Sequence, residues 1–201
     1  MPLDRSLSRN PDAEVDSMFV DRWSPRAFKQ GPLSKEQIDS LFEAARWAPS
    51  CFNEQPWLFV YAAQEADRQR LLPALVEDNQ VWAKQASLLI FLLCRRRFEQ
   101  SGKDNRHASF DAGAAWMALA LQARKLGLHA HAMAGFSREK AYQILQVSPE
   151  DYDIIAAIAV GYRTDPESLP ETLAAKEKPN QRKPKATIAR DLAAGPLSLK
   201  G

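Results

Sequence analysis

The chain has 201 residues, of which 45% are hydrophobic and 26% are charged, and its formal net charge at pH 7 is +2. This length allows one domain with a sizeable core, and the composition is typical of globular proteins. The small net charge argues against nucleic acid or a membrane surface as a partner. The most apolar run, "ASLLIFLLC", is followed directly by three arginines and is too short to span a bilayer.

The N-terminal residues, "MPLDRSLSRNPDAEV", contain no apolar segment typical of a secretory signal. Cys51 and Cys94 lie in unrelated contexts without metal-ligand spacing, so we expect a reduced, cytoplasmic protein. Residues 1–14 are polar and are predicted to form a flexible N-terminal arm.

The first part of the chain contains two predicted helices. Hydrophobic residues between positions 15 and 23 have helical spacing. Over residues 34–49, Ser34 and Gln37 form a capping box, and Pro49 ends the helix because its ring cannot continue the hydrogen-bond ladder.

The central part is predicted to form strands and helices around one sheet. Apolar runs at residues 57–62 and 87–93 are typical of strands buried on both faces. Further strands are expected at 129–134 and 153–162, and further helices around 68–76, 110–127 and 137–147. Helices outnumber strands and do not alternate strictly with them, which predicts an α+β fold with helices flanking a mixed sheet. This domain is expected to span residues 15–163.

The helix expected over residues 110–127 is rich in alanine, and Gly127 is its predicted C-terminal stop. Its small side chains would let another helix approach closely. The apolar face can therefore be an internal core face or the seam of a dimer, and the spacing alone does not choose between them. The residues in phase on this face are Ala114, Met117, Ala118 and Leu121.

Residues 164–201 hold five of the thirteen prolines and scattered lysines. Such a segment cannot build a core of its own. We expect an extended C-terminal arm that lies on another surface.

Two clusters of polar residues are candidates for a binding site. In "DRWSPRAF", Arg22, Ser24 and Arg26 occupy every second position and share a face if the segment is extended. Two guanidiniums beside a hydroxyl suit a phosphate group, although a solvated surface stretch would have the same pattern.

The second cluster is the loop "APSCFNEQPW". Ser50, Asn53 and Gln55 can both donate and accept hydrogen bonds, and Pro49 and Pro56 restrict the backbone between them. Such a loop could bind the edge of a flat polar heterocycle, or it could be a rigid connector whose hydrogen bonds are satisfied internally.

Together, "RWSPRAF" and "APSCFNEQPW" resemble the FMN-dependent nitroreductase family. "DAGAAWMALALQARKLGLHAHAMAGF", "IAVGYR" and "NQRKPKATI" are similar to later parts of the family pattern, so that the resemblance spans roughly residues 16–188. It implies a nitroreductase-like fold whose C-terminal arm, residues 164–201, is exchanged with the partner subunit of a homodimer.

The resemblance also implies roles for individual residues. Arg22, Ser24 and Arg26 match the segment that binds the FMN phosphate and ribityl chain. Pro49, Ser50, Asn53 and Gln55 match the segment that lies along the isoalloxazine ring, usually from the second subunit. Asn79 matches a ring-contacting asparagine, and Ala134–Gly135 matches the backbone turn beside the flavin N5 and O4. Arg182 matches a phosphate-binding residue, and Lys183 is a possible helper.

Two positions depart from the family pattern. Ala134 stands where relatives often have a polar side chain, but a backbone N–H contact to the flavin survives this change. Cys51 stands where a small polar residue is common, and its thiol is either redox-sensitive beside the flavin or inert.

The implied activity is that of an oxidoreductase in which FMN carries the chemistry and no side chain is catalytic. NADH or NADPH would reduce the flavin and leave, and a nitroaromatic, quinone or related conjugated acceptor would then enter the same cleft. The alternative is a flavin-binding sensor without turnover on the same fold.

Other candidate sites are weaker. His129 and His131 lie on alternate strand positions, but no third metal ligand is placed near them, so no metal site is expected. The basic run "CRRRF" could attract a phosphorylated nicotinamide and is better explained as a solvated face. Trp47 and Phe52 flank the polar loop and could contact substrate or pack in the core.

Overall fold

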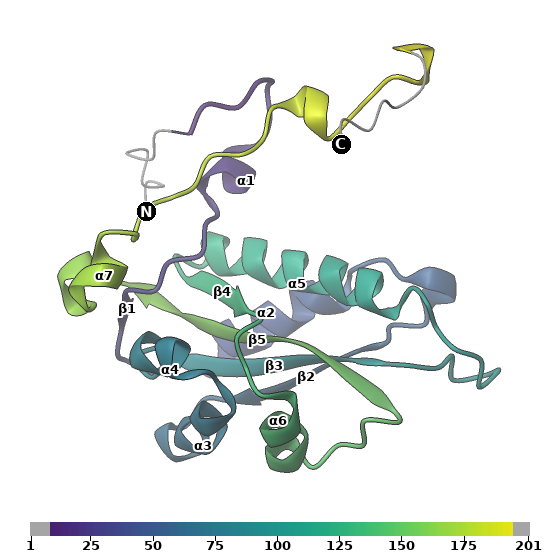
Figure 1. Cartoon of the computed structure of the whole chain (residues 1–201), viewed down its shortest axis with the longest axis horizontal. Helices are drawn as coiled ribbons and strands as arrows, with labels where there is room; N and C mark the ends of the chain where they lie inside the picture. Colours follow the sequence, from purple (N-terminus) through teal and green to yellow (C-terminus); the bar gives the residue numbers. More distant parts are fainter. Residues whose placement is uncertain (1–8, 195–201) are drawn as a thin grey trace.

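The computed structural model describes residues 9–194, and the outer ends of both predicted arms, residues 1–8 and 195–201, lie outside the described residues (Figure 1). The helices are α1 (Ser17–Asp21), α2 (Lys35–Arg46), α3 (Glu65–Leu71), α4 (Glu77–Ala83), α5 (Ala108–Lys125), α6 (Arg138–Leu145) and α7 (Glu171–Ala174). The strands are β1 (Phe28–Lys29), β2 (Trp57–Ala62), β3 (Leu88–Arg95), β4 (His129–Met133) and β5 (Tyr152–Arg163). The α+β class is confirmed.

The sheet is organised around β5, which pairs with β1, β3 and β4, while β2 pairs with β3. All four pairings among the described residues are antiparallel, so the prediction of a mixed sheet was wrong in this respect. Strands buried on both faces are usual in parallel sheets, but such burial shows only that helices cover both faces. The direction of a strand is not encoded in its apolar run.

Two hydrophobic cores lie on opposite faces of the sheet. In β3, Leu88, Ile90 and Leu92 pack into the core with α2 and α5, whereas Leu89 and Phe91 face the core around α3, α4 and α6. This alternation follows from the two-residue period of a strand. Figure 1 shows α5 and α2 on one side of the sheet and α3, α4 and α6 on the other.

Strand β2 differs from the prediction because it lies at the edge of the sheet. Leu58 is 38% exposed and Tyr61 is 49% exposed, so β2 is not buried on both faces. Its neighbour β3 is buried at every position from Leu88 to Cys94.

The N-terminal boundary of α2 forms as predicted. Ser34 Oγ accepts a hydrogen bond from the Gln37 backbone N–H at 3.2 Å, and Gln37 Oε1 accepts one from the Ser34 N–H at 2.9 Å. The preceding helix, α1, is shorter than its hydrophobic spacing suggested, because the chain is already extended at Arg22.

The face of α5 that packs in the core differs from the apolar stripe noted in the sequence, for which a core face and a dimer seam were both open. Ala112, Ala115 and Leu119 pack against the sheet, whereas Met117 is 37% exposed and Phe110 is 79% exposed. Alanine occurs on every side of this helix, so the spacing of apolar residues does not determine which side is buried. The predicted stripe of Ala114, Met117, Ala118 and Leu121 instead faces away from the core and remains available for contact.

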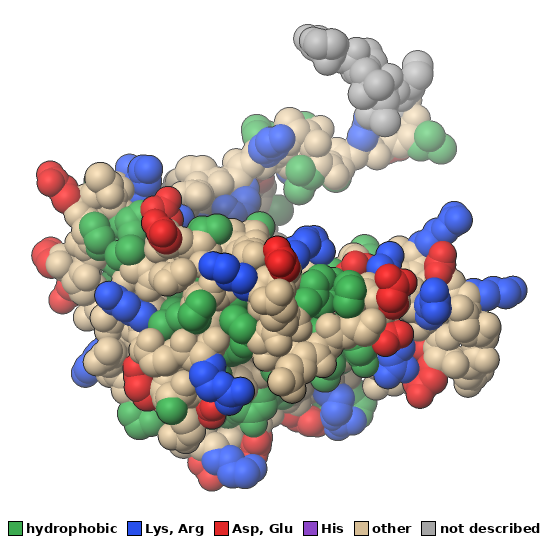
Figure 2. All heavy atoms as spheres, turned by 60° about the horizontal axis from the view of Figure 1, so that its bottom comes forward, with side chains coloured by type: hydrophobic (Ala, Val, Ile, Leu, Met, Phe, Trp, Pro, Cys, Tyr) green, Lys and Arg blue, Asp and Glu red, His purple; other side chains and the backbone are tan. Residues whose placement is uncertain are grey.

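The C-terminal arm begins after β5 and returns across the N-terminal segment. The Lys185 N–H lies 3.4 Å from Asp12 Oδ2. Beyond this point Ile188 is 76% exposed and Leu192 is 94% exposed. Figures 1 and 2 show this last described part standing clear of the body of the protein. Among the described residues, no helix combines the length and the apolar character needed to cross a membrane.

Candidate functional site

Arg22, Ser24 and Arg26 lie on one face of an extended segment between α1 and β1. The intervening residues, Trp23 and Pro25, are buried, while the three polar side chains are partly exposed. They open into a cavity of about 540 Å³, which we call the basic pocket. Its lining consists of Arg9, Arg22, Trp23, Ser24, Arg26, His131, Ala175, Lys176, Lys178, Asn180 and Arg182.

Positive charge is concentrated in the basic pocket. Partial burial, and then the nearby charge of Arg182, lower the pKa of Arg22. Burial also lowers the pKa of Arg9, as do the charges of Arg182 and Arg22, against the opposing effect of Asp21. Cations that disfavour one another in this way form a site that an anion would stabilise.

The C-terminal arm forms one wall of the basic pocket and is fixed there by Glu177. This carboxylate is 7% exposed, and its Oε1 accepts hydrogen bonds from the Arg26 N–H at 2.7 Å and the Ala27 N–H at 2.8 Å. Arg182 therefore reaches the same cavity as Arg22 and Arg26. Lys183 lies in a neighbouring hollow of about 210 Å³ with Asn10.

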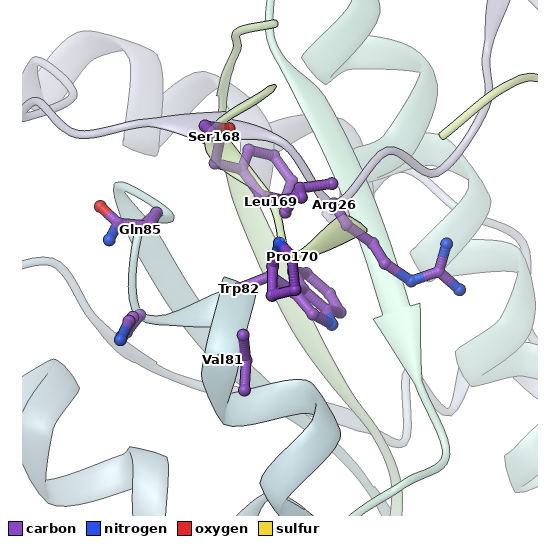
Figure 3. A pocket seen from close by; sticks show the side chains of 9 residues that line it. Arg26, Val81, Trp82, Gln85, Ser168, Leu169 and Pro170 are labelled. Carbon is purple, nitrogen blue, oxygen red and sulfur yellow. The ribbon is translucent and has the colours of Figure 1, made fainter. Parts of the chain in front are cut away.

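A further cavity of about 370 Å³ lies beside the basic pocket, between α4 and the segment Ser168–Pro170. Figure 3 shows Trp82 at its centre, near Pro170. The guanidinium of Arg26 extends away from Val81 and Gln85 in this view. Arg26 thus lines both cavities, and its guanidinium is directed away from the cavity beside α4.

Asn79 and Gly135 are brought together at the far end of β4. Asn79 Nδ2 donates a hydrogen bond to the Gly135 carbonyl at 3.0 Å. A Cβ at position 135 would lie 2.6 Å from Asn79 Nδ2, so glycine allows this close approach. Ala134 beside it is exposed. From His131 in the basic pocket to Gly135 the chain advances by four residues, about 13 Å for a strand.

The loop from Pro49 to Gln55 has an unusual backbone. Phe52, Asn53 and Gln55 have φ values of 53°, 56° and 50°, in the left-handed region that favours glycine. Asn53 and Gln55 are exposed, and Phe52 is 91% exposed. A conformation of this kind costs about 1–2 kcal/mol per residue and persists only where the surrounding structure enforces it.

Hydrogen bonds that involve side chains help to hold this loop. The Cys51 N–H donates to Asp111 Oδ2 at 3.1 Å, the Gln55 N–H donates to Ser50 Oγ at 3.0 Å, and Gln55 Nε2 donates to the Asn53 carbonyl at 2.9 Å. Pro49 and Ser50 are thus placed at the N-terminal end of α5. The loop is rigid, and part of its polar capacity is used internally.

Within one chain, the loop and the basic pocket are far apart. Trp57, where β2 begins after the loop, pairs with Cys94 of β3, which pairs with Asp153 of β5. His131 of the basic pocket pairs with Ala159, further along β5. Six residues along β5 correspond to about 20 Å, and the three strand spacings from β2 to β4 to about 14 Å. One small ligand could contact both regions only if the loop came from a second copy of the chain.

His131 lines the basic pocket, although its sequence position gave no specific signal for this. Its Nδ1 lies 2.8 Å from the Pro25 carbonyl oxygen, and its ring packs on Trp82 with centroids 4.7 Å apart. Burial is the main cause that lowers its pKa to about 4, with contributions from Arg26 and Arg22 and against the Pro25 hydrogen bond. The described residues contain no group of histidine, cysteine and acidic side chains that could hold a metal ion.

Sequence comparison places the chain among known proteins. The nitroreductase family pattern matches residues 20–88 and 76–162, more than half of the chain. A Streptomyces coelicolor protein named "Putative NADH dehydrogenase/NAD(P)H nitroreductase" is 29% identical over 100 residues, which are 50% of each chain, so the match spans half of that relative. The nitrobenzene nitroreductase of Ectopseudomonas oleovorans is 38% identical over 63 residues, 31% of this chain and 27% of that protein.

A solved structure is similar over almost the whole length. The crystal structure of an "oxidoreductase containing FMN" is 42% identical, with a TM-score of 0.88, and the match covers 93% of this chain and 96% of that one. The family match and the similarity in fold agree. The chain belongs to the nitroreductase family.

Proposed function

We propose that the protein is an FMN-dependent NAD(P)H oxidoreductase that reduces nitroaromatic, quinone or related conjugated acceptors. FMN is named in the description of the solved structure that is 42% identical, and NAD(P)H in that of the Streptomyces coelicolor relative. The observation that carries the proposal is the basic pocket, in which Arg22, Arg26 and Arg182 converge on one cavity.

The residues present fit FMN. The basic pocket supplies cations for a phosphate monoester, as the pattern of Arg22, Ser24 and Arg26 suggested. The edge of β4 leads from there to Gly135, where a Cβ would crowd Asn79. This distance of about 13 Å suits a cofactor with its anionic end at one side and its ring at the other.

The bound flavin would supply reversible hydride chemistry, and the protein would bind and orient it. Arg22, Arg26 and Arg182 would hold the phosphate, with Lys183 nearby as an accessory cation. The Ala134–Gly135 backbone and Asn79 would lie beside the ring. No side chain in this arrangement needs to act as a nucleophile or a general base.

The ring site would be completed by a second copy of the chain. Pro49, Ser50, Asn53 and Gln55 belong to the loop, in which Asn53 and Gln55 are exposed and which lies too far from the basic pocket of its own chain to reach it. An antiparallel pairing of two α5 helices would bring the loop at the N-terminal end of one helix to the C-terminal end of the other. The exposed stripe with Phe110 and Met117 provides an apolar seam for this homodimer.

Of the C-terminal arm, residues 164–201, the part beyond Lys185 would wrap the partner in the same dimer, since the part up to Arg182 lines the basic pocket of its own chain. Ile188 and Leu192 are more than three-quarters exposed, and contact with a second subunit would cover them. In this organisation residues 1–14 are the N-terminal arm and residues 15–163 the cofactor-binding domain. The free thiols Cys51 and Cys94 fit a reducing compartment such as the cytoplasm.

The test is to load the purified protein with FMN and add NADH or NADPH without oxygen. We expect rapid loss of the oxidised-flavin absorbance, and its return when a quinone or a nitroaromatic is added. Binding of FMN without reduction by either nicotinamide would instead support a non-catalytic flavin sensor. Failure to bind FMN would contradict the proposal as a whole.

A further inference from the structure

His131 lines the basic pocket with an imidazole ring that is held in position by two neighbours. Its ring packs on Trp82 with an interplanar angle of 32° and is held by the Pro25 carbonyl. We propose that Nε2 of His131 accepts a hydrogen bond from a hydroxyl of the ribityl chain of FMN. This inference rests on the proposed function and adds a polyol contact to the phosphate contacts.

The hydrogen-bond partner of Nδ1 determines the tautomer. A carbonyl oxygen can only accept, so Nδ1 must carry the hydrogen in its 2.8 Å contact with Pro25. A neutral imidazole with its hydrogen on Nδ1 has none on Nε2, so Nε2 is a hydrogen-bond acceptor. No hydrogen bond to Nε2 is present among the described residues, and the ring borders the cavity, so Nε2 is the polar atom that it offers to a ligand.

The surroundings keep the ring neutral. It faces Arg22 and Arg26 from the segment before β1, Trp82 from α4 and the Pro25 carbonyl. The loss of water on burial and, to a smaller extent, the two guanidiniums oppose a further positive charge, and these effects lower its pKa to about 4. His131 therefore does not add to the cationic set at neutral pH.

A neutral acceptor selects a different part of the ligand from that bound by the arginines. Its lone pair would repel a phosphate oxygen, whereas a hydroxyl can donate to it. The basic pocket thus offers two chemistries, with guanidiniums for the anionic end and an imidazole for an alcohol. A phosphate monoester of a polyol satisfies both, and inorganic phosphate satisfies only one.

The direct test compares the variants H131F and H131Q with the wild type. Phenylalanine keeps a flat ring against Trp82 and removes Nε2, while glutamine can place an amide oxygen near the position of Nε2. His107, which is exposed at the start of α5, provides the matched control H107F. Affinity is measured by flavin fluorescence for FMN, for lumiflavin and for FMN analogues that each lack one ribityl hydroxyl.

We expect H131F to weaken FMN binding about tenfold, the effect of one lost hydrogen bond. H131Q should retain part of the affinity, and H107F should bind as the wild type does. Binding of lumiflavin, which has no ribityl chain, should be unchanged. One deoxy analogue should bind equally to the wild type and H131F, because it lacks the donor that His131 would accept.

Several results would overturn the inference. One is equal affinity of H131F and the wild type for FMN, and another is an equal loss for lumiflavin, which would show a general effect on folding. If H131F does not fold, nitrogen-15 NMR of the wild-type imidazole decides, because FMN must shift Nε2 in the proposal and an unshifted Nε2 contradicts it. A wild type that does not bind FMN would instead refute the proposed function, and a wild type that binds while H131F is unaffected refutes only this contact.

Discussion

The basic pocket and the Pro49–Gln55 loop are built in opposite ways. The pocket combines an ordinary extended segment with an arm from the other end of the chain, and its side chains converge on a cavity. The loop is continuous in sequence, has three non-glycine residues with positive φ, and directs Phe52 and Asn53 outward. All residues that line the pocket therefore come from one chain, whereas the loop presents its strained residues at the surface, away from that pocket.

The largest expected effect comes from removing the guanidiniums of the pocket. Either R22A or R26A should weaken FMN binding by about 1.5–3 kcal/mol, the size of a lost charge-assisted hydrogen bond. The double variant should be largely free of flavin. Fluorescence titration measures these affinities, and R106A, at an exposed arginine outside both regions, is the matched control. Wild-type flavin content in the double variant would contradict the phosphate assignment.

The pocket should also make stability depend on pH. The pKa of His131 is lowered from 6.5 to about 4 in the folded protein, so between these values the unfolded chain binds more protons. The contribution of the neutral His131 to the free energy of unfolding is therefore complete above about pH 6.5. It is lost as the pH falls toward 4, and the free energy of unfolding then decreases by up to about 1.4 kcal/mol per pH unit. Urea unfolding at several pH values measures it.

The same measurement on H131F provides the contrast for the pH effect. This variant should show a shallower fall in stability between pH 6.5 and 4, because it has no imidazole to protonate. Identical pH profiles for H131F and the wild type would show that His131 is not the group responsible.

Asp111 of α5 is expected to hold the loop in position and not to contact the ligand. D111A leaves the Cys51 N–H without the acceptor that now lies 3.1 Å away, and should reduce stability by about 1–3 kcal/mol. D111N keeps an acceptor oxygen and should lose less. Chemical denaturation checks both variants, and equal stability of D111A and the wild type would remove this contact from the account of the loop.

The smallest expected effect concerns backbone strain at Asn53. Alanine tolerates φ of 56° less well than asparagine, so N53A should lower stability by about 1 kcal/mol. N53G removes the strain but gives the unfolded chain more freedom, so its stability should differ little from that of the wild type. If N53A proved as stable as N53G, the strained conformation would be the wrong description.

Much of the fold could be predicted because local signals determine it. The capping box at Ser34 and the buried strand β3 depend on residue types a few positions apart. The alternation of Arg22, Ser24 and Arg26 likewise shows which side chains share a face. These are statements about neighbouring residues, and the sequence contains the information they need.

The remaining features depend on contacts between distant parts of the chain. The buried side of α5 could not be predicted because alanine surrounds the helix, and antiparallel pairing has no signature in a uniformly apolar strand. From the sequence, His131 was weighed and discounted as a metal ligand, and no place in the basic pocket was predicted for it. Its place in the basic pocket follows from its contacts with Pro25 and Trp82, which lie more than forty residues away in the sequence. The distance between loop and pocket is likewise a property of the whole sheet.

The central claim is that the loop of one subunit completes the flavin-ring site that begins at the basic pocket of the other, and complementation between two defective proteins tests it most directly. One variant carries R22A and R26A, and the other carries N53A and Q55A. A dimer of the two would contain one site with an intact pocket and an intact partner loop. Random pairing of the variants, refolded together, should restore about a quarter of the wild-type complete sites and of the NAD(P)H-dependent activity, although each variant alone is deficient. A mixture that remains as deficient as its components would contradict the account.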